Sequence, residues 1–413
     1  MEPHFRLVCI GCGQRYNPDE MVYTCRRCGD LLTVDYDWSR LEDGEEIRRV
    51  WARRPRLSVW RYRELLPVLN EDNIISLGEG GTNLYDCRRL GAAFGLRELQ
   101  VKNEGENPTG SFKDRGMTVG VSRALELGAR GVICASTGNT SASLAAYSAR
   151  AGLHCLVVVP AGKIALGKLA QAMMYGAKVV AVNGNFDDAL SLVMDACTKL
   201  GLYLLNSVNA YRLEGQKTIG FELVEQRGWK HPDWIVLPVG NAGNISAIWK
   251  GVKELKRLGI IDEAPRMVGV QAEGAAPIAN AVKRGWLEDE IVEFVDKPET
   301  IATAIRIGRP VNWRKALRAI RESGGTAVAV SDSEIVDAQK LLARLEGVFV
   351  EPASAASIAG LRRLVEDGTI DRDESVVCIT TGHGLKDPEE AVRVCEKPLE
   401  IEPSLSKLEA ILR

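Results

Sequence analysis

Short apolar runs alternate along the chain with stretches of helical periodicity and with loops rich in glycine and small polar residues. The runs lack the strict alternation of a strand with one solvated face, so they are typical of strands buried on both faces. The stretches 141–151 and 167–175, which lie between such runs, have the period of helices. This order predicts repeated strand–helix units, and therefore mainly parallel sheets with helices on both faces. The predicted strands are 99–101, 132–135, 156–159, 179–182, 203–205, 235–239, 267–271, 327–330 and 376–380.

A chain of 413 residues is longer than one simple core needs, which favours two lobes and an appendage. The formal net charge of −2 gives no electrostatic reason to expect a nucleic-acid partner. No apolar run reaches the ~18 residues of a membrane span, and the N-terminus lacks the apolar core of a signal peptide. We therefore expect a small-molecule ligand, with neither nucleic acid nor membrane as a partner.

Four of the ten cysteines stand in two Cys-x-x-Cys pairs, Cys9 with Cys12 and Cys25 with Cys28, separated by twelve residues. This spacing is typical of a zinc ribbon, in which four thiolates close a tetrahedral, structural site. A segment this short buries little core, so a structural metal is physically motivated, with unligated thiols or two disulfides as alternatives. The other cysteines are scattered, several in apolar runs, which predicts reduced thiols and a cytoplasmic setting.

In folds of this kind ligands bind beyond the carboxyl ends of the strands, so the loops after strands are candidates for chemistry. The segment 106–116 reads as a loop that starts a helix, because its proline and glycine interrupt regular structure. Ser111 is the predicted N-cap, with Asp114 in the acidic position of a capping box. Lys113 then lies in the first turn, where the helix dipole disfavours its charged form. Schiff-base chemistry requires such a neutral amine, although position alone favours an ordinary surface lysine.

Three more loops join a predicted strand to a predicted helix and carry groups suited to anions. The loop 136–141 offers small hydroxyls, an amide and backbone N–H groups at a helix start, which suit a carboxylate. The loop 206–217 places Arg212 beside serine and asparagine, which suits a second anion. The loop 240–244 is glycine-rich, so its backbone can approach a phosphate. Taken alone, none of the three excludes an ordinary capped helix.

Together these loops resemble those of the tryptophan-synthase-beta superfamily of pyridoxal-phosphate enzymes, which has fold type II. The sequences Asn-Pro-Thr-Gly-Ser-Phe-Lys-Asp-Arg at 107–115 and Thr-Gly-His-Gly-Leu-Lys-Asp at 381–387 resemble the threonine synthase family in particular. Similar zinc ribbons precede many archaeal-type members. The resemblance implies an α/β fold of two lobes, each with a mainly parallel twisted sheet flanked by helices. The expected parts are a ribbon at 1–36, large-lobe segments at 37–98 and 206–413, and a small inserted lobe at 99–205.

The resemblance also implies roles for single residues. Lys113 is the expected Schiff-base lysine, which binds the cofactor and acts in catalysis, and Asn139 is the expected contact of the cofactor's ring hydroxyl. Thr381 is expected to meet the pyridine nitrogen, where a neutral hydroxyl leaves that nitrogen mostly unprotonated. His383 is expected to form a wall of the site rather than to act as a base. The expected cup for the 5′-phosphate is Gly240, Asn241, Ala242, Gly243 and Asn244, and the expected substrate contacts are Ser136, Thr137, Thr140, Ser207 and Arg212.

The implied protein is a cytoplasmic, homodimeric pyridoxal-phosphate lyase with structural zinc, which converts O-phospho-L-homoserine and water to L-threonine and phosphate. The anion loop at Arg212 favours a phosphorylated amino acid. Cysteate synthase, which joins O-phosphoserine with sulfite, would need the same loop, whereas a serine or threonine dehydratase would not. The alternative from another class is a non-catalytic zinc-ribbon adaptor, which the retained Lys113, Asn139 and Thr381 disfavour.

Overall fold

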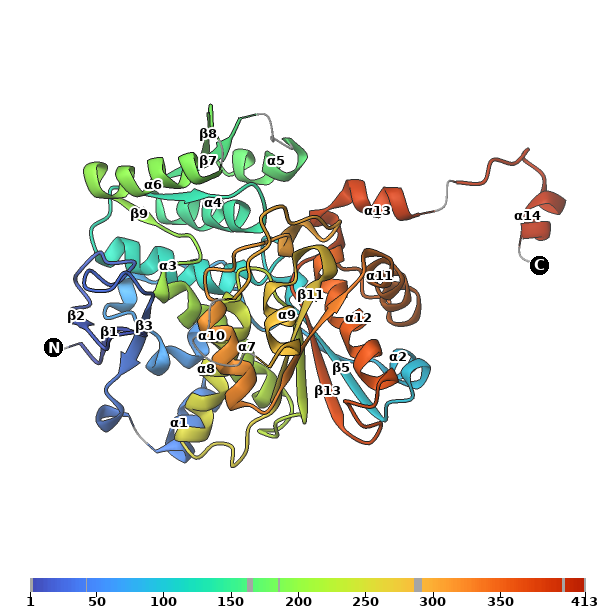
Figure 1. Ribbon diagram of the computed structural model, residues 1–413, viewed down its shortest axis with the longest axis horizontal. Helices are drawn as coiled ribbons and strands as arrows, with labels where there is room; N and C mark the ends of the chain where they lie inside the picture. The colour runs from blue at the N-terminus through green and yellow to red at the C-terminus, as the bar shows by residue number, and fades with distance from the viewer. Residues whose placement is uncertain are drawn as a thin grey trace.

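The computed structural model of this protein describes residues 3–41, 43–161, 166–184, 186–285, 292–395 and 398–411. Three sheets organise these residues, and helices pack around the two larger sheets (Figure 1). The strands are β1 (Phe5–Cys9), β2 (Arg15–Tyr16), β3 (Leu32–Tyr36), β4 (Leu84–Asp86), β5 (Glu98–Asn103), β6 (Gly131–Ala135), β7 (His154–Pro160), β8 (Lys178–Val182), β9 (Leu202–Leu204), β10 (Trp234–Pro238), β11 (Arg266–Ala272), β12 (Thr326–Val330) and β13 (Ser375–Thr380). The helices are α1 (Gly44–Arg53), α2 (Arg88–Phe94), α3 (Lys113–Glu126), α4 (Asn139–Ala151), α5 (Leu166–Met174), α6 (Phe186–Leu200), α7 (Ala210–Gln226), α8 (Gly243–Arg257), α9 (Pro277–Lys283), α10 (Trp313–Glu322), α11 (Asp332–Glu346), α12 (Pro352–Glu366), α13 (Pro388–Val394) and α14 (Leu405–Ile411).

The larger lobe is built on a six-stranded sheet in the order β12-β11-β10-β13-β5-β4, in which β4 alone runs antiparallel to its neighbour. Both faces of this sheet are buried. Ile235 and Leu237 of β10 belong to a core shared with α7, α8 and α10, whereas Trp234 and Val236 belong to a core shared with α11 and α12. This double burial explains why the strands appear in the sequence as continuous apolar runs. The prediction of parallel sheets covered on both faces is confirmed.

The smaller lobe is built on four parallel strands in the order β8-β7-β6-β9. Its faces are also buried separately. Val132 and Cys134 of β6 pack in the core that includes α3 and α4, and Ile133 and Ala135 pack with side chains of α6. The chain enters this sheet after α3 and leaves it before α7, so the lobe is inserted between segments of the larger one.

Strand β5 lies in the larger sheet, where it pairs in parallel with β13 from Glu98 to Asn103. The inserted lobe that was predicted at 99–205 therefore begins one strand too early, because the four-stranded sheet starts with β6. An apolar run carries no mark of the sheet that it joins. Membership depends on a pairing partner that lies far along the chain, and this partner is visible only in the folded structure.

The N-terminal sheet has the order β2-β1-β3, and its pairs are antiparallel. It packs firmly against the lobes. Phe5 and Leu7 of β1 share a core with Met117 of α3 and Tyr211 of α7. The rings of Phe5 and Tyr211 meet edge to face, with their centroids 6.2 Å apart. The ribbon is therefore part of the folded body and is positioned by it.

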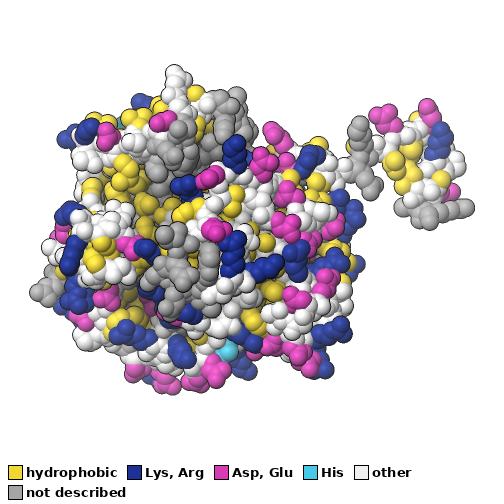
Figure 2. Space-filling model, viewed as in Figure 1, with side chains coloured by type: hydrophobic (Ala, Val, Ile, Leu, Met, Phe, Trp, Pro, Cys, Tyr) yellow, Lys and Arg dark blue, Asp and Glu magenta, His cyan; other side chains and the backbone are white. Residues whose placement is uncertain are grey.

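Helix α13 begins at the edge of this body, whereas the C-terminal helix α14 lies away from it (Figure 1) and exposes Leu405 and Leu408. Figure 2 shows lysine and arginine side chains interspersed with acidic ones over the face in view. Among the residues that the structure describes, no helix is both long enough and apolar enough to cross a membrane.

Candidate active site

A cavity of about 540 Å³ lies where strands of both lobes end. Its wall includes Ala135, the last residue of β6, and Pro238, the last residue of β10. Loops that follow β9 and β13 complete it, as expected for ligand sites at the carboxyl ends of parallel strands. Every residue expected to bind cofactor or substrate lines this one cavity: Lys113, Ser136, Thr137, Asn139, Thr140, Ser207, Arg212, Gly240, Asn241, Ala242, Gly243, Asn244 and Thr381.

Lys113 is the first residue of α3, as predicted, and its side chain reaches the cavity. Burial lowers the pKa of the Lys113 amine to about 7; the positive charge of Arg212 acts in the same direction, and the Glu351 carboxylate opposes them. The Nζ atom lies 3.7 Å from the centroid of the Phe112 ring. An amine with this pKa has a large neutral fraction at neutral pH, which a nucleophile or base needs. Burial, rather than the helix dipole, is the main cause.

The start of α3 differs from the predicted capping box. Its N-cap is Phe112, which caps nothing with its side chain, and the Oγ atom of Ser111 has no hydrogen-bond partner among the described residues. Asp114 turns back toward the preceding loop, where it accepts hydrogen bonds from the N–H of Thr109 at 2.7 Å and from its hydroxyl at 2.6 Å. It also accepts one from the Ser143 hydroxyl at 2.6 Å. The carboxylate therefore fixes the lysine loop instead of capping the helix.

Arg115, from the same motif, holds α3 against its neighbours. Its fully buried guanidinium pairs with Glu104 at 2.6 Å and with Glu222 of α7 at 2.8 Å. Glu222 also accepts from Lys102 Nζ at 2.5 Å and from the N–H of Gly81 at 2.8 Å. Burial opposes the ionisation of Glu222, but the charges of Arg115 and Lys102 outweigh burial and hold its pKa well below the usual range. The buried ion pairs of Arg115 therefore fix the segment that carries Lys113 to its neighbours.

The glycine-rich loop leads into α8 and leaves the start of that helix open. The N-cap residue is Ala242, which has a left-handed backbone (φ 62°) and no side-chain cap. Gly240 lies so close to the next loop that a Cβ atom there would meet the Ala304 carbonyl at 3.1 Å. The amide oxygen and nitrogen of Asn244 are buried and lack hydrogen-bond partners in the described part of the chain. An uncapped helix start beside an unpartnered amide is suited to binding an anion.

Arg212 lies in the first turn of α7 and is buried. Its Nη1 donates to the carbonyl of Leu205 at 3.2 Å, and its Nε has no partner among the described residues. Burial lowers the pKa of Arg212 to about 10, so the side chain stays charged at neutral pH. Asn312, at the start of α10, donates from Nδ2 to the Ser207 carbonyl at 3.1 Å and from its backbone N–H to Asn241 at 3.0 Å. One residue therefore ties the two anion loops together.

Thr381 follows β13 and is held by Ser354 of α12. The Oγ of Ser354 accepts the backbone N–H groups of Thr381 and Gly382, both at 2.8 Å, and lies 3.0 Å from the Thr381 hydroxyl. It also donates to the Gly382 carbonyl at 3.1 Å. Because Ser354 already accepts two hydrogen bonds, the Thr381 hydroxyl proton is available to an acceptor in the cavity.

His383 is not part of the cavity wall, so the expectation that it forms one is wrong. Its Nδ1 accepts the backbone N–H of Leu385 at 3.1 Å, and its ring meets Phe349 edge to face. His383 is therefore a local turn residue, which accepts a hydrogen bond within its own loop. His383 is only two residues after Thr381, but side chains of one loop can point in different directions, so it need not face the cavity.

Two cavity residues carry contacts that the sequence did not indicate. Glu351 lines the cavity with its carboxylate next to the Asn139 amide. Asn206 bonds with its side chain to both backbone groups of Ala135, at 2.9 and 3.0 Å, and so ties the loops after β9 and β6 together. For Glu351 the signal in the sequence is Pro352, since proline is typical of the first position of a helix. For Asn206 it was a small amide directly after a strand.

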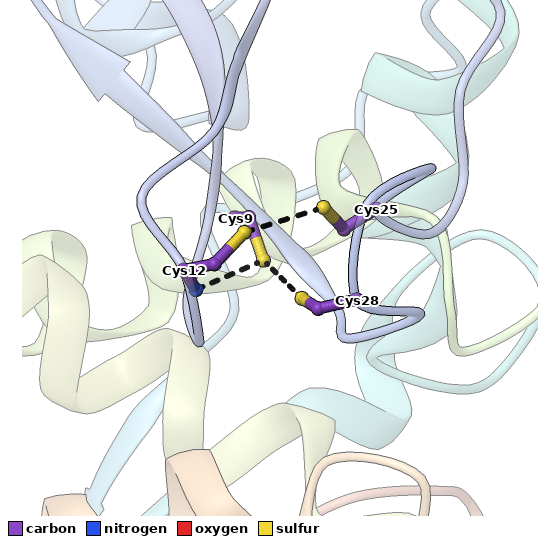
Figure 3. Close-up of side chains that lie close together, drawn as sticks. All are labelled: Cys9, Cys12, Cys25 and Cys28. Carbon is purple, nitrogen blue, oxygen red and sulfur yellow. Dashed lines mark hydrogen bonds between the residues drawn. The ribbon is translucent and has the colours of Figure 1, made fainter.

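The four ribbon cysteines turn toward one point (Figure 3), and their Sγ atoms lie within 4.8 Å of one another. The Sγ atoms of Cys9 and Cys28 are 3.4 Å apart, and those of Cys12 and Cys25 are 3.5 Å apart. All four are free cysteines in the structure, and their convergence favours a four-sulfur metal site over two disulfides. The separations approach the ~3.8 Å edge of a tetrahedron with Zn–S bonds of ~2.3 Å. Backbone N–H groups point at the sulfurs, as from Arg27 to Cys25 at 3.4 Å.

A larger cavity of about 800 Å³ lies between β3 of the ribbon and helices α8 and α10. None of the expected cofactor or substrate residues lines it. Its wall includes Glu214 and Glu254, which pair with the buried Lys217 at 2.6 and 2.7 Å. Lys217 is therefore already paired with two carboxylates, whereas the smaller cavity combines Lys113 with buried nitrogens of Arg212 and Asn244 that have no hydrogen-bond partner among the described residues. Chemistry, rather than size, identifies the site.

Residues 75–382 match the family described as "Pyridoxal-phosphate dependent enzyme". The threonine synthase of Methanocaldococcus jannaschii is 60% identical over 405 residues, which cover 98% of each chain. That of Methanosarcina acetivorans is 58% identical over 405 residues, again 98% of each. A third, from Mycobacterium tuberculosis, is 54% identical over 333 residues, or 80% of this chain and 89% of its own.

Among solved structures, maize serine racemase superposes with a TM-score of 0.64 at 20% identity, over 90% of this chain and 99% of that one. Threonine deaminase isoform 2 of Solanum lycopersicum gives 0.65 at 22% identity, over 86% and 89%. These likenesses show the fold. The fold and the cavity define a pyridoxal-phosphate dependent enzyme of fold type II, and the chain belongs to that family. Within it, the chain belongs with the threonine synthases.

Proposed function

We propose that this chain catalyses the conversion of O-phospho-L-homoserine and water to L-threonine and phosphate, with pyridoxal 5′-phosphate as cofactor. The observation that carries the proposal is a single cavity with a lysine of low pKa and two separate anion subsites. A phosphorylated cofactor and a phosphorylated substrate need two such subsites. The Methanocaldococcus relative, which aligns with 98% of this chain, bears the name threonine synthase.

The residues present fit pyridoxal phosphate. The open start of α8 and the unpartnered Asn244 amide suit its 5′-phosphate, and Lys113 suits its aldehyde. Asn139 and Thr381 would hold the ring at its hydroxyl and its nitrogen. When bound, the cofactor supplies an electron sink that stabilises negative charge on the substrate carbons.

Substrate binding uses the remaining polar groups of the cavity. Ser136, Thr137 and Thr140 would receive the α-carboxylate, since they lie at the start of α4, whose N-cap Gly138 provides no side chain. Arg212 and Ser207 would receive the substrate phosphate. Holding both ends of the substrate orients its Cα and Cβ hydrogens toward one base.

Lys113 is that base. Its neutral amine takes the proton from Cα and must release it before it takes a proton from Cβ. Phosphate then leaves Cγ, the hydroxide of water adds at Cβ, and protons return to Cγ and Cα. A pKa of about 7 lets the amine both accept and return a proton near neutral pH. The released phosphate, held at Arg212 and Ser207, would assist proton transfer to and from the water.

We also propose that the four ribbon cysteines hold structural zinc and that the chain is a cytoplasmic homodimer. The four convergent thiols support zinc, because four cysteine sulfurs are a typical zinc ligand set. Such a closed site leaves no open position for catalysis, so the zinc would be structural. The exposed leucines of α14 support self-association, since apolar side chains left in water gain from burial. One zinc per chain by elemental analysis, and the mass in solution with and without residues 398–413, test these points.

The product assay separates the proposal from its rivals. Protein loaded with pyridoxal phosphate receives O-phospho-L-homoserine, and phosphate and L-threonine are quantified together. Matched release of both supports the proposal. Phosphate with 2-oxobutyrate would mean that water is not directed to Cβ. Turnover of O-phosphoserine with sulfite but not of phosphohomoserine would replace threonine synthase by cysteate synthase. A protein without any cofactor absorbance would fit the non-catalytic adaptor.

A further inference from the structure

The turn at the start of α12 has no part in the steps above, yet it lies against the cavity. Glu351 is the N-cap residue of this helix, but its carboxylate makes no hydrogen bond to the helix. The residue lines the cavity and is only 5% exposed. Its backbone N–H donates to the Gly382 carbonyl at 3.0 Å, which joins α12 to the loop that carries Thr381. Burying a carboxylate is costly unless it is hydrogen-bonded, so a buried carboxylate that does not cap its own helix needs a partner elsewhere.

That contact is the amide of Asn139. Its Nδ2 lies 3.1 and 3.3 Å from the two carboxylate oxygens of Glu351. The absence of a side chain at Gly382 makes room for the carboxylate, because a Cβ atom there would lie 2.6 Å from Oε1. The fold therefore provides a fitted seat for the carboxylate beside the residue expected at the cofactor ring.

The chemistry of this contact fixes which way the amide faces. A carboxylate only accepts hydrogen bonds, so Asn139 must turn its Nδ2 toward Glu351. An asparagine amide without such a partner turns over at little cost and presents either its oxygen or its nitrogen. With one Nδ2 hydrogen on Glu351, the second is left for an acceptor in the cavity. The ring oxygen of pyridoxal phosphate, when ionised, is such an acceptor.

The first turn of α12 also holds the loop of Thr381, the residue expected to contact the nitrogen of the cofactor ring. Ser354, three residues after Glu351, binds the backbone of Thr381 and Gly382 through its Oγ. We propose that Glu351 is a positioning residue for the cofactor: it locks the Asn139 amide, while Ser354 locks Thr381, so one turn of α12 sets both ring contacts. This inference rests on the cofactor site proposed above.

The charges that face Glu351 come from α3, through Lys113, and from the turn that holds Lys386 and Asp387. Burial raises the pKa of Glu351, and the Asn139 hydrogen bond lowers it. The charges of Lys113 and Lys386 lower it too, whereas Asp387 raises it. The carboxylate therefore lies within electrostatic reach of the lysine amine, and its removal changes both the orientation of the amide and the field at the cavity.

The test uses Glu351→Gln, which keeps the shape of the side chain. The glutamine amide can both accept and donate hydrogen bonds, so it no longer fixes whether the oxygen or the nitrogen of the Asn139 amide faces it. Cofactor-free protein is titrated with pyridoxal phosphate by absorbance. We expect the dissociation constant to rise about tenfold or more, the size of one lost charge-assisted hydrogen bond. The pH at which the cofactor band changes should shift as well. Glu366→Gln, at the exposed end of the same helix, is the matched control and should bind as the natural protein does.

A double variant separates positioning from a folding defect. In an Asn139→Ala background, Glu351→Gln should add less than about twofold to the dissociation constant, because its partner is gone. Natural affinity together with an unchanged band in Glu351→Gln would overturn the inference. So would a full tenfold effect that persists without Asn139. If the natural protein shows no cofactor band, the proposed function fails instead, so the two failures are distinguishable.

Discussion

Arg212 acts on Lys113 across the cavity: after burial, its positive charge is the next cause that lowers the pKa of the Lys113 amine to about 7. Arg212 itself keeps its charge at neutral pH, since burial lowers its pKa only to about 10. The residue proposed to bind the substrate phosphate therefore also keeps the base neutral. A dianion at Arg212 would offset this charge and raise the pKa of Lys113. Substrate binding would thus help the lysine to hold the proton that it has taken.

The pH dependence of cofactor capture follows from this pair. A protonated amine does not attack an aldehyde, so the rate at which cofactor-free protein binds pyridoxal phosphate should rise with pH, with a midpoint of about 7. Arg212→Gln removes a positive charge and should move the midpoint upward. Stopped-flow absorbance between about pH 5.5 and 9 measures it. A midpoint near the ~10.4 of a free lysine would contradict the structure.

The phosphate subsite can be tested apart from the cofactor. Arg212→Ala should lower kcat/KM for phosphohomoserine by about a hundredfold or more, because a buried anion loses its charged donor. Measured at about pH 9, where the Lys113 amine is neutral in the natural protein, it should change the dissociation constant of pyridoxal phosphate by less than about threefold. Arg212→Lys, the control, keeps the charge but loses the planar fork and should fall between the two. Equal losses of threonine formation and cofactor binding would contradict the proposed role.

The hydroxyl of Thr381 is expected to meet the ring nitrogen. Thr381→Val keeps the shape and leaves that nitrogen without a partner, so kcat should fall roughly ten- to hundredfold. Thr381→Ser keeps the hydroxyl and should retain most of the rate. Steady-state kinetics with both variants gives the comparison. Equal rates for the two variants would show that the hydroxyl has no such partner.

The buried ion pairs of Glu222 with Arg115 and Lys102 should contribute strongly to the stability of the protein. Glu222→Gln leaves the buried charges of Arg115 and Lys102 poorly compensated and should destabilise the protein by about 3 kcal/mol in urea unfolding. The control Glu366→Gln breaks an exposed pair and should change stability by less than about 0.5 kcal/mol. The lowered pKa of Glu222 means that its contribution is present above the unfolded value of ~4.3 and is lost as the pH falls below it. The difference between variant and natural protein should therefore shrink in acid.

Removal of zinc from the ribbon should weaken phosphate binding at the loop that carries Ser207. Asp30, two residues after the last ribbon cysteine, pairs with Arg314 at 2.9 Å, and Lys315 donates to the Leu32 carbonyl at 2.8 Å. Both cations lie on α10, next to Asn312, which holds Ser207. Chelation should therefore lower the melting temperature and weaken inhibition by inorganic phosphate at least about twofold. Unchanged phosphate inhibition in protein shown to be zinc-free would contradict this link.

The sequence identified the loops of the site because each combines suitable local chemistry with a resemblance to a family motif. A lysine after a proline–glycine break, an arginine at a helix start and a glycine-rich turn after an apolar run are all visible within about a dozen residues. Parallel pairing then brings loops after strands to the same edge, which is why the expected residues meet in one cavity. The Cys-x-x-Cys spacing was equally local, and its four thiols converge.

What the sequence did not show depends on partners far along the chain. Ser111 and Asp114 have the spacing of a capping box, yet Asp114 accepts hydrogen bonds from Thr109 of the preceding loop and from Ser143 of another helix. The run at 99–101 looks like any buried strand, but only pairing with β13 places it in the larger sheet.

By itself, the sequence determined the class of fold, the loops that supply the expected residues of the cavity, and the cysteine cluster, since periodicity, turns and short motifs are encoded in neighbouring residues. Only the tertiary structure decided how those residues are tuned. Burial beside Arg212 sets the pKa of Lys113, and Glu351 reaches Asn139 across more than two hundred positions of sequence. Electrostatic and hydrogen-bond contacts depend on distance in space, which the linear order of residues does not contain.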